Sequence, residues 1–222
     1  MSNFWEQQLS AIREQLLLMS GMTERNFAQA MRALVERDDK LADWVEAEDS
    51  RIDELEVQID EMVITYMATH APVARDCRLM LTASKISNNL ERIADQATKI
   101  ARRTRELNSE PLLKPLIDIP LMAEIAQGML RDGISAFVDG NSDLAIEIIA
   151  RDRSVDSINK QLQRELTSFM VENPQTITRA LNLMTVAKAI ERVADHATNI
   201  AEEVFYLSKG EDIRHDNSLK QA

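Results

Sequence analysis

The sequence predicts an all-α protein built as two tandem antiparallel three-helix bundles, six long helices related by internal duplication. Only five Gly and five Pro occur in 222 residues, so turns are few and the elements between them must be long. Apolar residues recur every seven positions in several segments, as in helices that pack in bundles. The segment 91–101 also returns as 191–201 with eight of eleven residues identical, which indicates that one half of the chain repeats the other.

Capping residues and prolines set the expected boundaries. Asp38 and Asp39 precede one apolar run, and Asn141 and Ser142 precede the corresponding run in the second half; Asp, Asn and Ser are all good N-caps. Prolines mark further ends, because they disrupt helix interiors. The expected helices span residues 4–37, 40–69, 73–108, 116–139, 142–171 and 175–208. The chain then divides into repeat 1 (1–110), a Pro-rich linker (111–120), repeat 2 (121–208) and a polar C-terminal tail (209–222).

Heptad spacing identifies the faces that should pack in each bundle. The expected core positions of three helices are Val45, Ile52, Ile59 and Tyr66; Ile86, Ile93, Ile100 and Leu107; and Val186, Val193, Ile200 and Leu207. Short turns between such helices make neighbours antiparallel. A helix of about 30 residues is ~45 Å long, so the molecule should be elongated.

Composition excludes several classes of protein. A formal charge of −11 argues against binding to nucleic acid, whose phosphates require clustered Lys and Arg. Cys77 is the single cysteine, and the N-terminus does not resemble a signal peptide, so the cytoplasm is the expected location. No apolar run approaches the ~20 residues of a membrane-spanning helix. Association with a membrane is therefore expected only through a partner.

The duplicated segment retains the pattern Glu-x-x-x-Asp, as Glu91 with Asp95 and Glu191 with Asp195. Residues four apart share one face of a helix. Helical periodicity places these pairs opposite the apolar stripe, so they should face outward. The same outward face should hold Asn88, Thr98 and Arg102 in the first copy, and Lys188, Thr198 and Glu202 in the second. A solvated polar face is the alternative interpretation, although it gives no reason for such identity between copies.

A second pair of acids precedes each motif on the neighbouring helix. These are Asp49 with Asp53 in the first half and Asp152 with Asp156 in the second. Four acids that converge from two helices would form an oxygen-rich site for Mg²⁺, Mn²⁺ or iron, and zinc remains a candidate. Asn159 and Gln163 stand where the first half has further acids, so the first site should be the more anionic.

Signatures of catalysis are missing from the sequence. It has no Gly-rich phosphate loop, no Gly-x-Ser-x-Gly elbow and no Cys/His cluster. It also lacks the Glu-x-x-His pair of ferritin-like di-iron centres. His196 is expected to form hydrogen bonds as a neutral ring, with metal ligation as the alternative, and Cys77 is expected to pack as a small core residue. No basic residues are expected to converge near the motifs, so no phosphate site is predicted.

These motifs resemble the PhoU family of bacterial phosphate-signalling regulators. Besides the two repeat motifs, the resemblance includes Gly21-Met22, the segment 71–79 and the segment 199–215. The chain differs from the family pattern at Ala94 and Ala194, where Gly is common, and at Gln96, where His is frequent.

The resemblance implies a cytoplasmic, dimeric, non-enzymatic protein that represses the phosphate-starvation response. Its implied partners are a PhoR-type sensor histidine kinase and the PstB-like ATPase subunit of the phosphate-specific ABC transporter. It also implies metal clusters at the matching positions, which are Asp49, Asp53, Glu91, Asp95, Asp152, Asp156, Glu191 and Asp195. Two alternatives remain: a carboxylate metal store or metalloenzyme, and a structural bundle whose acids only make it soluble.

Overall fold

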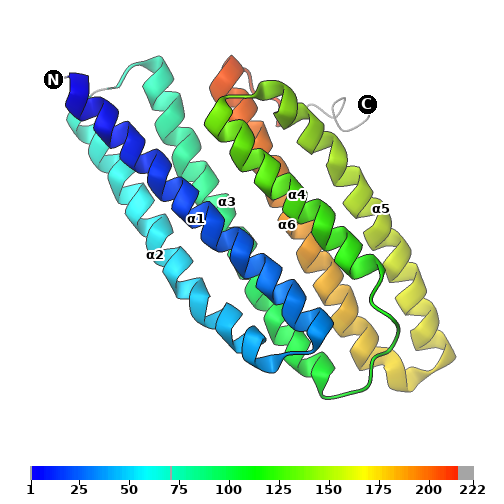
Figure 1. The fold of residues 1–222 in the computed structure, drawn as a ribbon. Helices are drawn as coiled ribbons and strands as arrows, with labels where there is room; N and C mark the ends of the chain where they lie inside the picture. Colours follow the sequence, from blue (N-terminus) through cyan, green and yellow to red (C-terminus); the bar gives the residue numbers. More distant parts are fainter. Residues whose placement is uncertain (1, 71, 215–222) are drawn as a thin grey trace.

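The computed structural model describes residues 2–70 and 72–214, with side chains of the first helix described from residue 7 onward. Its described part contains six α-helices, one 3₁₀ turn and no strands (Figure 1). Their bounds are α1 (Ser2–Glu36), α2 (Asp39–His70), α3 (Ala74–Asn108), α4 (Asp118–Asp139), α5 (Ser142–Glu172), η1 (Pro174–Thr176) and α6 (Ile177–Lys209). Each helix boundary lies within two residues of the expected one. Residues 215–222 of the expected tail lie outside the described residues.

The expected caps form. Asp38 Oδ1 accepts hydrogen bonds from the backbone N–H groups of residues 40 and 41, and Asn141 Oδ1 does the same at the start of α5. Gly140 ends α4 in the left-handed conformation, with φ 65°. Arg37 also has a positive φ of 57°, and its guanidinium donates to the carbonyls of Leu107, Asn108 and Glu110. This contact fixes the α1–α2 turn against the end of α3.

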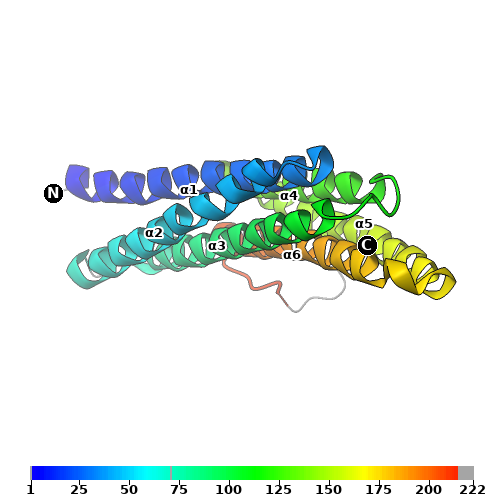
Figure 2. The same ribbon diagram turned by 90° about the horizontal axis from the view of Figure 1, so that it is seen from below.

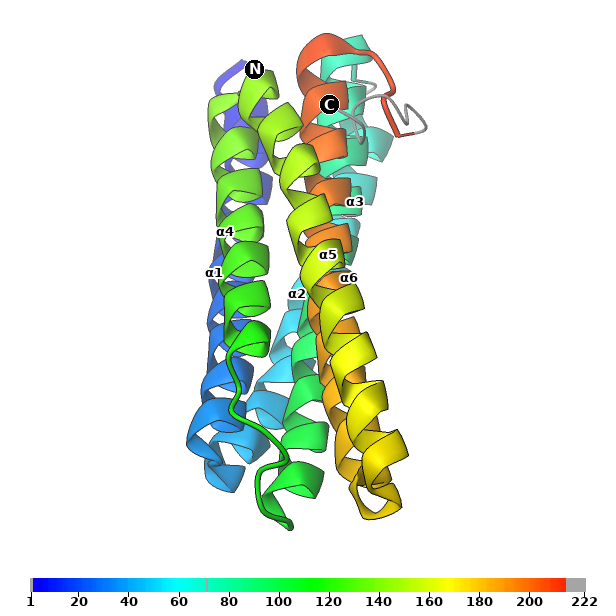
Figure 3. The ribbon, with the colours of Figure 1, turned by 90° about the vertical axis from the view of Figure 1, so that its right-hand side faces the viewer.

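The helices form two layers. α2, α3, α6 and α5 lie side by side in that order, while α1 covers α2 and α3 and α4 covers α6 and α5 on one face (Figure 2). Viewed from the side, α4 lies alongside α1 and α6 lies next to α5 (Figure 3). The two three-helix bundles therefore meet along α3 and α6, which are the helices that carry the repeated motif.

The heptad positions form the core. All eight named stripe residues of α2 and α3 are buried, as are Val186, Val193 and Ile200 of α6, whereas Leu207 is half-buried. No helix in the described part of the chain has the length and apolar character needed to cross a bilayer. The helices instead bury their apolar stripes against one another.

Polar contacts join the two halves. Arg131 of α4 pairs with Glu24 of α1 at 2.8 Å, and Lys85 of α3 pairs with the buried Glu203 of α6 at 2.9 Å. His196 Nδ1 lies 2.9 Å from Asn89 Oδ1 across the α3–α6 contact. The last two contacts fix the position of one motif helix relative to the other.

Candidate functional site

The motif helices are more enclosed than the sequence predicts. Thr98 is 4% exposed, Thr198 2% and Glu202 7%, so their expected outward placement is wrong. A helical wheel with one buried stripe fails here because α3 packs against α1, α2 and α6, and α6 packs against α3, α4 and α5. Only narrow strips of α3 and α6 reach solvent, and the acids of the motif lie at the edges of these strips.

The first acidic site comprises Asp49 and Asp53 of α2 with Glu91 and Asp95 of α3. The structure brings these residues close enough to perturb one another. Burial and the neighbouring Asp53 raise the pKa of Asp49, although Thr98 opposes that shift. Burial and the negative charge of Asp95 likewise raise the pKa of Asp53. The carboxylates of this site therefore repel one another across the α2–α3 contact.

Glu91 is the most perturbed acid of the first site. Its side chain is 15% exposed. Burial, followed by the negative charge of Asp95, raises its pKa to about 7, and nearby Arg92 only partly opposes this shift. Arg92 lies 3.2 Å from Glu91 and 3.3 Å from Asp95. Near neutral pH the site thus holds a carboxyl group poised between its acid and carboxylate forms.

Residues around the first site add to its acidity. Asn88 donates a 2.9 Å hydrogen bond to Glu56, and Ser84 donates a 2.6 Å hydrogen bond to Asp60. Arg102 reaches Glu46 at 3.2 Å. The acids of α2 therefore form a continuous row beside α3. Within this row, Glu56 and Asp60 accept hydrogen bonds from neutral side chains.

The second acidic site comprises Asp152 and Asp156 of α5 with Glu191 and Asp195 of α6. Asp152 is buried at 9% exposure, and Asp195 is exposed. Cations accompany two of its acids: Lys188 pairs with Glu191, and Lys160 lies 3.8 Å from Asp156. Asn159 is buried where the first half has Glu56. This site is the less anionic of the two.

Both sites present the donor atoms that hard cations prefer, which are carboxylate oxygens. In the first site, mutual repulsion supports a cation as the missing counter-charge. Within the described residues, however, no three His, Cys, Asp or Glu side chains are already arranged around one point as metal ligands. Binding would therefore require side-chain rotations that draw the acids of each site together.

A polar groove of about 560 Å³ runs between α3 and α6, and we call it the central groove. It is lined by Arg92, Asp95, Gln96, Lys99, Arg192, Asp195, His196, Thr198 and Asn199. Three cationic side chains thus meet beside the motifs, and the expectation that no basic residues converge there is wrong. That expectation treated each helix alone, whereas the groove forms only where the two copies pack together.

His196 forms the hydrogen bond with Asn89 that a neutral ring can make. Burial lowers its pKa, and the positive charges of Arg92 and Arg192 lower it further. For their charges to lower the pKa of His196, both guanidinium groups must lie near its ring. Cys77 is half-buried, and its thiol donates to the carbonyl of Pro72.

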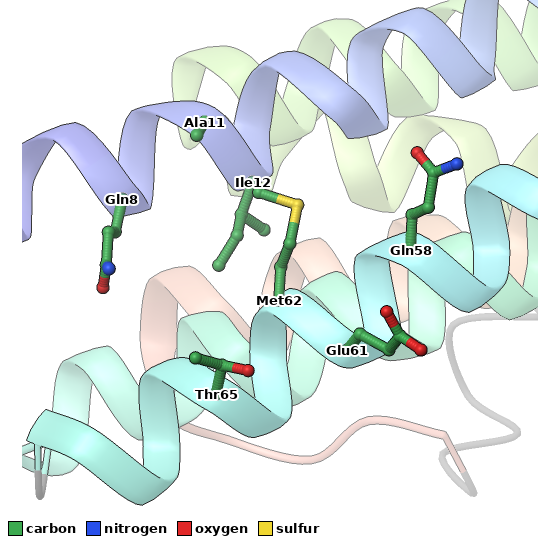
Figure 4. A pocket seen from close by; sticks show the side chains of 7 residues that line it. All are labelled: Gln8, Ala11, Ile12, Gln58, Glu61, Met62 and Thr65. Atoms are coloured by element: carbon green, nitrogen blue, oxygen red, sulfur yellow. The ribbon is translucent and has the colours of Figure 1, made fainter.

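A second hollow of about 380 Å³ opens between α1 and α2 (Figure 4). Met62 reaches from α2 toward Ile12 of α1 at its base, and Gln8 and Gln58 lie at its rim. Among the described residues that line this hollow, Glu61 is the one titratable group.

The sequence did contain a signal for the central groove. Arg92 and Arg192 are identical in the two copies, directly after the repeated Glu. The predicted site residues are all acids and do not include these arginines. Lys85 and Glu203 carried no such signal, because their counterparts in the other copy, Thr185 and Arg103, differ from them.

Comparisons with known proteins agree with this architecture. The family model described as the PhoU domain matches twice, at residues 16–104 and 119–204. A phosphate-specific transport system accessory protein PhoU homolog of Aquifex aeolicus is 38% identical over 210 residues, which cover 95% of both chains. The accessory protein PhoU of Escherichia coli is 35% identical over 208 residues, covering 94% of this chain and 86% of that protein. The crystal structure of PhoU from Pseudomonas aeruginosa superposes with a TM-score of 0.91 at 36% identity, over 93% of this chain and 100% of that one.

Proposed function

The chain belongs to the PhoU family, and we propose that it is a non-enzymatic regulator of phosphate transport that represses the phosphate-starvation response when phosphate is plentiful. Family membership supports the role in phosphate transport, because the relatives are named as accessory proteins of that system. The observation that carries the proposal is the pair of acidic sites at equivalent places in the two halves, without accompanying catalytic groups.

We propose that each acidic site holds divalent cations or iron. Asp49, Asp53, Glu91 and Asp95 would bind metal in the first half, and Asp152, Asp156, Glu191 and Asp195 in the second. Bound cations would neutralise the acids and draw α2 toward α3 and α5 toward α6, since their ligands come from both helices of each pair. Mg²⁺, Mn²⁺ and iron suit these oxygen donors, and zinc can also bind carboxylates.

The regulator is proposed to act in the cytoplasm as a homodimer. Its partners would be the PstB-like ATPase subunit of a phosphate-specific ABC transporter and a PhoR-type sensor histidine kinase. A rigid layer of long helices suits such docking, because it presents a broad surface that changes little on binding. Contact with the membrane would come through these partners.

The test is alkaline phosphatase activity of the source bacterium in phosphate-rich medium, with and without this gene. Deletion should raise the activity strongly, and the intact gene should restore repression. The double variant Asp95→Ala/Asp195→Ala should fail to restore it if the acidic sites are needed. The matched control is Glu54→Ala/Glu172→Ala, which removes two exposed acids elsewhere on α2 and α5.

Activity that stays low in the deletion strain would overturn the regulatory role. Full repression by the Asp95→Ala/Asp195→Ala variant would leave that role standing but remove the acidic sites from it. Partner binding can be measured separately by pull-down with the ATPase subunit and the kinase domain.

A further inference from the structure

The central groove combines side chains from both copies of the repeat. Eight of its nine lining residues fall into equivalent pairs one hundred positions apart: Arg92 and Arg192, Asp95 and Asp195, Gln96 and His196, and Lys99 and Asn199. α3 and α6 run antiparallel (Figure 1), and His196 of α6 lies beside Asn89 of α3. The groove therefore lies where the internal duplication brings its two halves face to face.

Hydrogen-bond donors dominate this lining. Each Arg offers five N–H donors, Lys99 offers three, and Gln96 and Asn199 each offer an amide group. Lys99 already approaches Gln96 at 3.3 Å, and Asn199 donates to Asn89 at 3.3 Å. Arg92 is held by Glu91 at 3.2 Å and Asp95 at 3.3 Å, which orients its guanidinium at the edge of the groove.

Two carboxylates, Asp95 and Asp195, lie among these donors. A carboxylate has about four acceptor positions, so one that holds an Arg can accept a further hydrogen bond. A ligand matching this lining must accept bonds from Arg and Lys and also donate one to a carboxylate. Inorganic phosphate meets both requirements, because at neutral pH it has several anionic oxygens and retains at least one hydroxyl. Sulfate has the oxygens without the hydroxyl.

We propose that the central groove binds inorganic phosphate, with Arg92, Arg192 and Lys99 donating to its oxygens and Asp95 or Asp195 accepting from its hydroxyl. Arg is suited to this role because its planar donors match a tetrahedral oxyanion. The volume of about 560 Å³ accommodates the ion together with water. The groove is open to solvent, so we expect moderate affinity.

The first acidic site adjoins this groove. Asp95 and Lys99 line the central groove and also a smaller hollow of about 250 Å³ with Asp49 and Thr98. An anion on one side of Asp95 and a cation on the other would attract each other. Phosphate and metal should therefore strengthen each other's binding, although phosphate binding does not require the metal.

The experiment is isothermal titration of the purified full chain, freed of metal by chelation, with inorganic phosphate and separately with sulfate at equal ionic strength. We expect phosphate to bind about tenfold more tightly than sulfate, because only phosphate has a hydroxyl that can donate to Asp95 or Asp195. Arg92→Gln/Arg192→Gln should weaken phosphate binding about tenfold or more. Arg51→Gln/Arg153→Gln removes the same charge from exposed positions on α2 and α5 and should leave binding unchanged.

A second variant tests the carboxylates. Asp95→Asn/Asp195→Asn replaces acceptors with amide groups that also donate, so preference for phosphate over sulfate should fall toward one. Circular dichroism confirms that each variant is folded. Equal binding of phosphate and sulfate by the unchanged chain overturns the proposed specificity. Phosphate binding that survives Arg92→Gln/Arg192→Gln, or that occurs only with added Mn²⁺, overturns the proposed site.

The binding experiment is independent of the regulatory assay. If the purified chain does not bind phosphate while the gene still represses alkaline phosphatase, only the groove proposal fails. If phosphate binds in the groove while deletion has no effect on alkaline phosphatase, only the regulatory role fails.

Discussion

The two acidic sites derive from one repeated motif but have different electrostatic surroundings. In the first site, Asp49, Asp53 and Glu91 all have raised pKa values, because they are partly buried beside other carboxylates. In the second site, Lys188 and Lys160 accompany Glu191 and Asp156. In the first site one cation, Arg92, lies beside two acids and only partly opposes the raised pKa of Glu91, whereas in the second site each of two acids has its own lysine.

This difference shows what the duplication retained and what it changed. The Glu-x-x-x-Asp acids and their helices are common to both halves, whereas neighbouring positions differ. Asn88 corresponds to Lys188, and Glu56 corresponds to the buried Asn159. If the repeated acids bind metal as proposed, the residues beside them should give the two sites different affinities.

The largest expected effect concerns metal binding. Asp49→Asn/Asp53→Asn should weaken Mn²⁺ binding more than about hundredfold at the tighter site, because it removes two carboxylate ligands. Asp152→Asn/Asp156→Asn makes the same change in the second half and should affect only the weaker site. Calorimetry with Mn²⁺ on chelator-treated protein measures both. If both variants weaken Mn²⁺ binding equally, the two sites do not differ in affinity.

The next effect concerns an ion pair that only one half possesses. Glu203 is 7% exposed at its side chain and Lys85 is 31% exposed. Removing Lys85 leaves the buried Glu203 with only the longer 3.9 Å contact to Arg214, so Lys85→Ala should lower the free energy of unfolding by about 2–3 kcal/mol. The equivalent Thr185→Ala should cost about 1 kcal/mol or less, since its hydroxyl bonds only to the carbonyl of Leu181. Urea denaturation measures both, and a cost for Lys85→Ala no larger than that of Thr185→Ala would refute this role of the pair.

The third prediction concerns how the free energy of unfolding changes with pH. Glu91 has a pKa of about 7 in the folded chain, raised chiefly by burial, against about 4.5 when it is unfolded. The folded state binds more protons between these values, so the free energy of unfolding falls as pH rises through that window. Glu91→Gln abolishes this loss and should stabilise the metal-free protein by about 1–2 kcal/mol at pH 8, after allowance for solvent screening. The gain should vanish near pH 4.

Denaturation at a series of pH values from 4 to 8 measures this effect. Glu191→Gln, the same change in the second site, supplies the comparison profile. If Glu91→Gln stabilises the protein by the same amount at every pH, the stabilisation does not come from removing a carboxyl group that titrates in this range.

Much of this architecture could be predicted from the sequence, for identifiable physical reasons. Local rules determine caps and heptad stripes, so Asp38, Asn141 and the buried Ile52 or Ile93 lie where expected. Packing between helices distant in the chain is not local. The burial of Thr98 and the meeting of Arg92 with Arg192 both depend on α3 packing against α6, which no single-helix pattern contains. The acids could be selected because they recur, but the raised pKa of Glu91 depends chiefly on burial, which packing between helices creates, and on the neighbouring Asp95.

The smallest expected effect comes from a test of whether the difference between Asn88 and Lys188 accounts for part of the difference between the two sites. Asn88→Lys places an ammonium three residues before Glu91, as Lys188 is placed before Glu191. An exposed helical ion pair contributes about 0.3–0.5 kcal/mol, so the pKa of Glu91 should fall by a few tenths of a unit. Carbon-detected NMR titration of the Glu91 carboxyl measures this shift, with Ser50→Lys as an exposed control on α2. If Asn88→Lys does not lower the pKa of Glu91 at all, this neighbour on α3 does not account for the difference between the two sites.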